Sequence, residues 1–233
     1  MTILEVAIVI LVLAILAAFL FPVFARVREY SGPTCFSNLK QIGLSLSEYV
    51  QDNDGRLPPR QASVGGKQIS WRGIVYPYIR SARTLQCPTS VNNVLPDFEN
   101  DGLPRSYAVN STLGGSFGDD HPNLSISKIA TPRDVILVAE STSGFGDFDP
   151  LKPGAFARQA TTGKDAGCMR VHLSRSNFLF ADGHVTGINP LLTIGAQPLQ
   201  PNYWTIDNRP YSLTDRKTAQ YTLGYAVEHG EKR

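Results

Sequence analysis

The feature that most constrains this chain is an unbroken apolar run near its N-terminus. Residues 6–25 carry no charged side chain, and Glu5 is the only charged residue among the first 25. As a helix, these 20 residues would span about 30 Å at about 1.5 Å per residue. That length matches the hydrocarbon core of a bilayer. The sequence therefore predicts membrane insertion at some stage of the protein's life.

The run has two other readings. A secretory signal peptide would have a positively charged stretch before the run and a small-residue cleavage site close after it, and the sequence has neither. A helix buried in a soluble core is the second alternative, but a fully apolar segment of this length at the very start of a chain is rare in soluble folds.

Glu5 poses a separate problem, because a carboxylate beside such a run is costly in a bilayer. The sequence offers no basic side chain before Arg26. A capping role in the first helical turn would contribute about 1 kcal/mol or less. The other reading is that Glu5 meets a positive charge supplied by something else.

The next stretch, "CFSNLKQIGLSLSEYVQDNDG" (35–55), has apolar residues at steps of three and four with polar residues between them. This pattern predicts an amphipathic helix with one buried face, ended near Gly55. Residues 2–53 thus read as one long helix or as two helices end to end. Pro22 is one expected break. Gly32 and Pro33 are the other, with a kink at 31–33 and Pro33 in the first turn of a new helix.

Beyond Gly55 the pattern changes to strands and turns. Stretches 105–113 and 134–141 are rich in β-branched residues and predict strands. In "SNFLFADGHVTGI" (176–188), Asp182 and Gly183 stand between two strand-like runs and predict a hairpin turn. "WRGIVYPYI" (71–79) reads as a short strand or a helix ended by Pro77. The last 40 residues predict edge strands or a surface excursion.

These signals predict two parts. Residues 1–54 form the N-terminal helix, with 1–25 as the membrane or filament-core segment, and residues 55–233 form a β-rich head. The net charge of the 233-residue chain is +2, which gives no strong attraction to nucleic acid, and none is expected as a partner.

Several stretches resemble a known family. "TILEVAIVILVLAILAAFLFPVFARVRE" is similar to the N-terminal segment of type IV pilins and type II secretion pseudopilins. "CFSNLKQIGLSLSEYVQDNDGRLPP", "YIRSARTLQCP", "SYAVNSTL" and "FADGHV" resemble a bacterial branch with an H-X9-DG motif, which reads here as His172 followed by Asp182 and Gly183. The resemblance implies a pilin-like α+β fold, in which a long N-terminal helix with a projecting apolar first half packs on an antiparallel sheet.

In that family a prepilin peptidase removes a short leader, the new N-terminus is methylated, and Glu stands at the fifth mature position. Glu5 is fifth counting from Met1, so the resemblance implies that the chain is recorded in mature form. It also implies that the Glu5 carboxylate meets an N-terminal amine, its own or a neighbour's, during assembly. Opposite charges attract strongly in a low-dielectric setting, and either one alone is costly to desolvate.

The chain has three cysteines, and an exported head in an oxidising space favours disulfides. Cys35 and Cys87 match positions that carry Cys in the resembling family, which implies a Cys35–Cys87 bridge. Such a bridge would contribute roughly 4 kcal/mol in the chain-entropy model. Cys168 is then expected to be free and buried, with an intermolecular link as the alternative.

Four other polar residues have two readings. We expect structural roles for His172, Asp182, His184 and Glu140, with a metal or catalytic cluster of the same residues as the alternative. No catalytic residue, cofactor or metal site is expected. Calcium is the weaker reading of two acidic loops, with Asp97, Asp101, Asp119 and Asp120 as candidates. Asn110 and Asn123 fit the glycosylation pattern.

Three functions remain open. The first is a non-enzymatic structural subunit of a helical filament of identical chains, held in the inner membrane as a precursor and then displayed at the cell surface. It would depend on prepilin peptidase and on the pilus or secretion assembly machinery. The second is a pseudopilin of a type II secretion system. The third is a membrane-tethered head that binds a ligand or metal.

Overall fold

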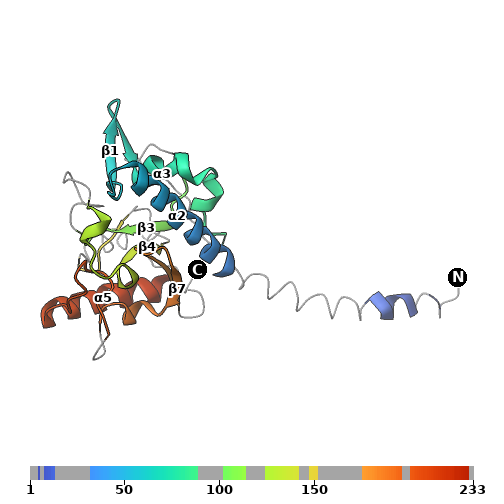
Figure 1. Ribbon diagram of the computed structural model, residues 1–233. Coiled ribbons are helices and arrows are strands. Elements are labelled where there is room, and N and C mark those ends of the chain that lie inside the picture. The colour runs from blue at the N-terminus through green and yellow to red at the C-terminus, as the bar shows by residue number, and fades with distance from the viewer. Residues whose placement is uncertain are drawn as a thin grey trace.

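The computed structural model describes residues 5, 8–13, 32–88, 102–113, 124–141, 147–151, 175–195 and 200–230. Within these ranges the architecture is α+β. A five-stranded sheet lies between α2 (Gly32–Asp52) with α3 (Trp71–Ile79) on one side and α5 (Leu213–Gly230) on the other (Figure 1). Short 3-10 helices connect these elements: η1 (Ala82–Leu85), η2 (Ile126–Lys128), η3 (Pro132–Asp134) and η4 (Pro190–Leu192).

The strand order of the sheet is β5-β3-β4-β6-β7. Its members are β3 (Tyr107–Asn110), β4 (Ile136–Glu140), β5 (Asp147–Phe148), β6 (Ser176–Phe180) and β7 (Val185–Ile188). The pairs β3–β4, β4–β6 and β6–β7 are antiparallel, whereas β5 runs parallel to β3. The β-rich stretches expected at 105–113, 134–141 and 176–188 therefore correspond to β3, β4 and the β6–β7 hairpin. The expectation of a wholly antiparallel sheet is corrected at the β5 edge.

Helix α2 lies against one face of this sheet because its apolar residues recur at helical spacing. Leu39, Ile42 and Leu46 are buried almost completely, as the amphipathic pattern predicts. Gly43 lets the helix approach β6 closely: a Cβ built at this position would lie 2.8 Å from Leu179 Cδ1. The fit between α2 and β6 thus depends on the missing side chain of Gly43.

Helix α3 closes the same layer. A hairpin of β1 (Gln61–Val64) and β2 (Lys67–Ser70) leads into it. We expected a strand, or a helix ended by Pro77. The structure has a helix that contains Pro77, ends at Ile79 and is capped by Arg80, whose φ is 64°. Trp71 at its start is fully buried.

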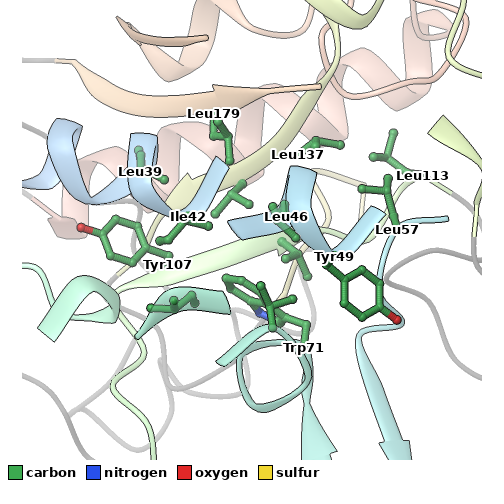
Figure 2. Close-up of a cluster of buried hydrophobic side chains, with 14 of the residues drawn as sticks. Leu39, Ile42, Leu46, Tyr49, Leu57, Trp71, Tyr107, Leu113, Leu137 and Leu179 are labelled. Atoms are coloured by element: carbon green, nitrogen blue, oxygen red, sulfur yellow. The ribbon is translucent and has the colours of Figure 1, made fainter. Parts of the chain in front are cut away.

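The larger hydrophobic cluster fills the space between these helices and the sheet. Figure 2 shows residues of α2 lying between Leu179 of β6 and Trp71 of α3, with Tyr107 of β3 alongside. Leu179 belongs to this cluster, whereas its neighbours Phe178 and Phe180 belong to the cluster on the opposite face. Successive side chains of a strand point to opposite faces of its sheet, and β6 follows this rule.

The second cluster lies under α5 and is centred on Trp204, which is fully buried. The Trp204 ring lies 5.1 Å from the Phe148 ring and 6.1 Å from the Phe178 ring, centroid to centroid. Helix α5 contributes Ala219 and Leu223. The prediction of edge strands or a surface excursion for the last 40 residues is therefore wrong, since that stretch contains the 18-residue α5, which packs on the second cluster.

The predicted pilin-like architecture, with a long apolar N-terminal helix packed on the sheet, is also wrong. The long helix that packs on the sheet is α2, which begins at Gly32 and is polar on one side. Before it, the described residues 5 and 8–13 are helical. Pro33 lies in the first described turn of α2, where a proline was expected. Pro22 and residue 31 lie outside the described residues.

No described helix combines the length and the apolar character that crossing a membrane requires.

Candidate assembly site

The first part of the candidate site is the helical stretch of residues 8–13. Its six side chains are all apolar and between 49% and 62% exposed. Glu5, close before them, lies at an exposed helical position. Figure 1 shows this stretch well apart from the sheet and its helices. An exposed run of consecutive large apolar residues is typical of a surface that another molecule covers. Met1, the other residue assigned to assembly, lies outside the described part of the chain.

The second part is the disulfide between Cys35 and Cys87, the pairing that the resemblance implied. The two Cα atoms are 5.5 Å apart and both residues are fully buried, which is ordinary disulfide geometry. The bridge ties the first turn of α2 to the segment after η1. Asn38 Nδ2 donates to the Gln86 carbonyl at 2.9 Å, and Thr84 Oγ1 donates to Gln41 Oε1 at 2.9 Å. The start of α2 is therefore held covalently and by hydrogen bonds.

A buried carboxylate lies beside this disulfide. The side-chain oxygen of Glu140 and the two sulfurs lie within 4.8 Å of one another. Glu140 accepts hydrogen bonds from the backbone N and the Nδ2 of Asn177 at 2.9 and 3.0 Å. Since the sulfurs are bonded to each other, they offer no thiolate to a metal. Glu140 here joins the end of β4 to the start of β6.

Tyr107 lies opposite Glu140 in the β3–β4 register. Burial raises the pKa of the Tyr107 hydroxyl, and the charge of Glu140 adds to that rise, while a hydrogen bond with Asn38 opposes it. Arg72 is fully buried and its Nη1 donates to the Tyr107 carbonyl at 3.4 Å. These contacts make the disulfide end of the sheet a packed polar cluster.

The third part is the turn between β6 and β7. Asp182 Oδ1 accepts from the backbone N of His184 at 3.0 Å and lies 2.5 Å from His184 Nδ1. The His184 ring stacks on Phe180 at 4.3 Å. Partial burial pushes the Asp182 pKa up, but the hydrogen bonds from His184 outweigh it and hold that pKa below its usual value. Gly183, with φ of 86°, completes the turn.

The structure does not bring Glu140 together with Asp182 and His184, as a shared metal or catalytic cluster would require. Glu140 binds Asn177 near the start of β6, whereas Asp182 and His184 follow its end. A five-residue strand spans about 17 Å at about 3.4 Å per residue. His172, the first residue of the H-X9-DG motif, lies outside the described residues. Among the described residues, then, Asp182 and Gly183 have a turn-forming role.

A groove runs between α2 and this turn, and we call it the α2–β6 groove. It has a volume of about 180 Å³, and its apolar lining includes Leu46, Val50, Leu57, Ile126, Leu137 and Leu179. Gly43 and Ser47 of α2 form one side, and Gly183 of the turn forms the other. None of the described side chains that line it is charged. This groove could not be predicted from local sequence patterns, because its lining comes from separate segments of the chain, among them α2 and the β6–β7 turn.

A second, polar pocket of about 570 Å³ lies near the disulfide. Hydrogen-bonding side chains from α2 and η1 line it, among them Asn38, Gln41, Arg83 and Thr84.

Asn110 is the one proposed glycosylation residue that the structure describes. It is only 1% exposed, and its Nδ2 donates to the carbonyls of Ile136 and Trp204 at 2.8 and 3.1 Å. This burial argues against a sugar on Asn110 in the folded chain. The remaining candidates lie outside the described residues: Asn123, Cys168, Asp97, Asp101, Asp119 and Asp120.

A scan against protein-family models and searches of curated proteins and of solved structures found no match to this chain.

Proposed function

We propose that this protein is a structural subunit of a helical, type IV pilus-like filament, assembled through its apolar N-terminal residues. The observation that carries the proposal is the exposure of residues 8–13, where six consecutive apolar side chains are 49–62% exposed. Leaving apolar surface in water costs about 25 cal/mol per Å². Lipid before assembly, and other copies of the chain afterwards, would remove that cost.

Glu5 gives this association its register. A carboxylate moved from water into an apolar environment needs an opposite charge close by, because the desolvation cost otherwise dominates. The N-terminal amine of a neighbouring copy supplies that charge, and the positive end of a helix adds to it. A neighbour shifted along the axis would move the two charges apart. Charge pairing thus selects one axial position among many that apolar contact alone would allow.

The head is the outward part of the subunit in this proposal. Identical subunits that contact one another through two different surfaces build an open helical array when the rotation does not close. The same proposal places the precursor in the inner membrane, where prepilin peptidase and the assembly machinery act on it, and the filament at the cell surface.

Electron microscopy of cells that express the chain, with a tag on the head, tests the proposal. Long labelled fibres that disappear with Glu5→Ala are the expected result. Short envelope-bound assemblies found only with a secretion system would favour the pseudopilin alternative. Labelled protein that stays monomeric in the membrane would contradict both.

The polar pocket near the disulfide favours a second candidate function, a membrane-tethered head that binds a small polar ligand. Its volume of about 570 Å³ lies in the range of small-molecule sites. Thr84→Val would remove a hydroxyl from the pocket wall. A ligand captured by the wild-type chain and lost in this variant, from protein that forms no fibres, would support this candidate over the first.

A further inference from the structure

We infer that reduction of the Cys35–Cys87 bridge converts the buried end of the sheet into a zinc site, with the two sulfurs and the Glu140 carboxylate as ligands. The inference goes beyond the proposed function and does not rest on it. It gives the carboxylate beside the disulfide a chemical role in addition to its contact with Asn177.

The three ligand atoms already lie close together. Both sulfurs and a side-chain oxygen of Glu140 lie within 4.8 Å of one another, and all three residues are fully buried. A tetrahedral zinc ion with Zn–S distances of about 2.3 Å holds two sulfurs about 3.8 Å apart. The Cα atoms of Cys35 and Cys87 are 5.5 Å apart, so rotation of the side chains would bring the separated sulfurs to that spacing. Two thiolates, one carboxylate and one water form a four-coordinate set that zinc accepts.

The ligands are also held in place by neighbouring groups. Asn177 donates to Glu140 Oε2 through its backbone N at 2.9 Å and to Oε1 through Nδ2 at 3.0 Å. A carboxylate offers about four lone-pair sites, so an oxygen that accepts from Asn177 can bind a metal as well. Hydrogen bonds of this kind orient a ligand and are part of most metal sites.

The two cysteines stay close to each other when the bond between them breaks. Asn38 Nδ2 donates to the carbonyl of Gln86, the residue before Cys87, at 2.9 Å. This contact joins α2 to the segment after η1 and does not depend on the disulfide. The reduced head therefore keeps both sulfurs next to Glu140.

The charges at this end of the sheet favour a divalent cation. Two thiolates and one carboxylate would bring three negative charges into a buried site, which is costly unless they are balanced. Zinc supplies two positive charges. Arg72 supplies a third, since it is fully buried and its Nη1 donates to the carbonyl of Tyr107, which lies opposite Glu140.

The polar pocket near the disulfide gives an ion a path to the sulfurs. Its lining includes Thr34, Gln86 and Pro88, which are the sequence neighbours of the two cysteines. The cysteines themselves are fully buried, so an ion reaches them only when this wall opens locally. Breaking the covalent tie between α2 and the segment after η1 permits that opening.

The conversion is a two-electron reduction followed by metal binding. A phosphine reductant takes the oxygen of one water molecule and becomes a phosphine oxide. The S–S bond breaks, and the two hydrogens of that water complete two thiols. Zinc then replaces both thiol protons, which pass to the solvent.

Metal titration of the full-length chain in detergent tests the inference. A Cys168→Ser background leaves Cys35 and Cys87 as the only cysteines. After reduction by a phosphine in metal-free buffer, the chain should bind one zinc ion in competition with a chromogenic chelator. Cadmium should give a thiolate-to-metal charge-transfer band with the intensity of two sulfurs per ion. The oxidised chain should show neither signal.

A matched pair of substitutions tests the third ligand. Glu140→Gln keeps the shape of the side chain but removes its charge, and it should weaken zinc binding by more than about tenfold. Glu48→Gln makes the same change at an exposed position of α2 and should leave the affinity unchanged. If Glu140→Gln does not fold, Asn177→Ala replaces it, since loss of the orienting donor should weaken zinc binding by about tenfold.

Four results would overturn the inference. Equal zinc affinity in Glu140→Gln and Glu48→Gln would exclude Glu140 as a ligand. Equal binding by the oxidised and reduced chains would indicate an adventitious ion only. The other two results are a folded reduced chain that binds no zinc, and a reduced chain that is unfolded with and without zinc. None of them affects the filament proposal, because fibre yield is measured on chains with the disulfide intact.

Discussion

Two apolar stretches of this chain differ in how far their side chains are buried. In α2, Leu39 and Ile42 are fully buried, whereas Ile10 and Leu11 in the N-terminal stretch are 62% and 61% exposed. The difference lies in the spacing of the apolar residues. Helix α2 has one apolar side, which a sheet can cover completely, while residues 8–13 are apolar all round. A single sheet face cannot cover such a stretch on all sides, and in the proposed filament surfaces from outside the subunit cover it.

Side chains of α2 and of residues 8–13 should therefore affect two different equilibria, folding and association. Apolar side chains of α2 contribute to the free energy of unfolding, because unfolding exposes them. In the proposed filament, those of residues 8–13 contribute to association. Substitutions in the two stretches should therefore separate stability from assembly.

The largest effect is expected for Glu5→Ala. This variant should still enter the membrane and unfold as the wild type does, but fibre yield should fall by more than about tenfold because the neighbour's amine loses its partner. Fibre counts by electron microscopy measure it, with the exposed Glu48→Ala of α2 as the control. Mutant fibres at wild-type yield would refute charge pairing.

Removal of the disulfide should have the largest effect on stability. The bridge joins residues 52 positions apart, and the chain-entropy model gives about 4 kcal/mol for a loop of that length. Cys35→Ser with Cys87→Ser should lower the free energy of unfolding in urea by that amount. A reducing agent should have the same effect on the wild type and none on the variant. An unchanged urea midpoint after verified reduction would show that packing alone holds α2.

Leu46→Ala against Leu11→Ala tests the comparison directly. Leu46 is 2% exposed in the core, so truncation should cost about 3 kcal/mol of stability. Leu11 is 61% exposed, so the same truncation should change stability by less than about 0.5 kcal/mol while lowering fibre yield. Urea unfolding and fibre counts on the same samples give both readouts. A stability loss at Leu11 equal to that at Leu46 would show that residues 8–13 pack on the head.

The smallest effect is expected at the β6–β7 turn. The folded-state pKa of Asp182 lies below its ordinary value, so its ionised form contributes stability above about pH 4. That stability is lost as the pH falls through the lowered folded-state pKa. Asp182→Asn should therefore make thermal unfolding less dependent on pH in the acid range. Identical acid profiles for both proteins would refute a stabilising role for the Asp182–His184 contact.

Local patterns in the sequence predicted much of the head. The spacing of Leu39, Ile42 and Leu46 gave the buried side of α2, and Asp182-Gly183 gave the hairpin turn. The disulfide came from the family resemblance. The helix side and the hairpin turn could be predicted because each depends on residues close in sequence.

Other features could not be predicted from the sequence, because their signals are weak or depend on residues far apart in the chain. Helix α5 places few large apolar side chains in the core, so its periodicity is faint. The start of α5 does have a recognisable sequence signal, a serine followed three residues later by an acidic residue. In the structure, Asp215 N donates to Ser212 Oγ at 3.1 Å, and Ser212 Oγ donates to Asp215 Oδ2. Strand β5 has only two residues. The glycosylation pattern at Asn110 says nothing of burial, which tertiary contacts with Trp204 decide.

The position of the disulfide has a mechanical consequence. Tension applied to residues 8–13 reaches the head through the first turn of α2, where Cys35 lies. From there a covalent bond passes the force to Cys87 before it reaches the side chains of Leu39 and Ile42. Without that bond, a pull could peel α2 from the sheet one turn at a time. With it, the force enters the head beside η1, and the apolar contacts further along α2 are shielded from the load.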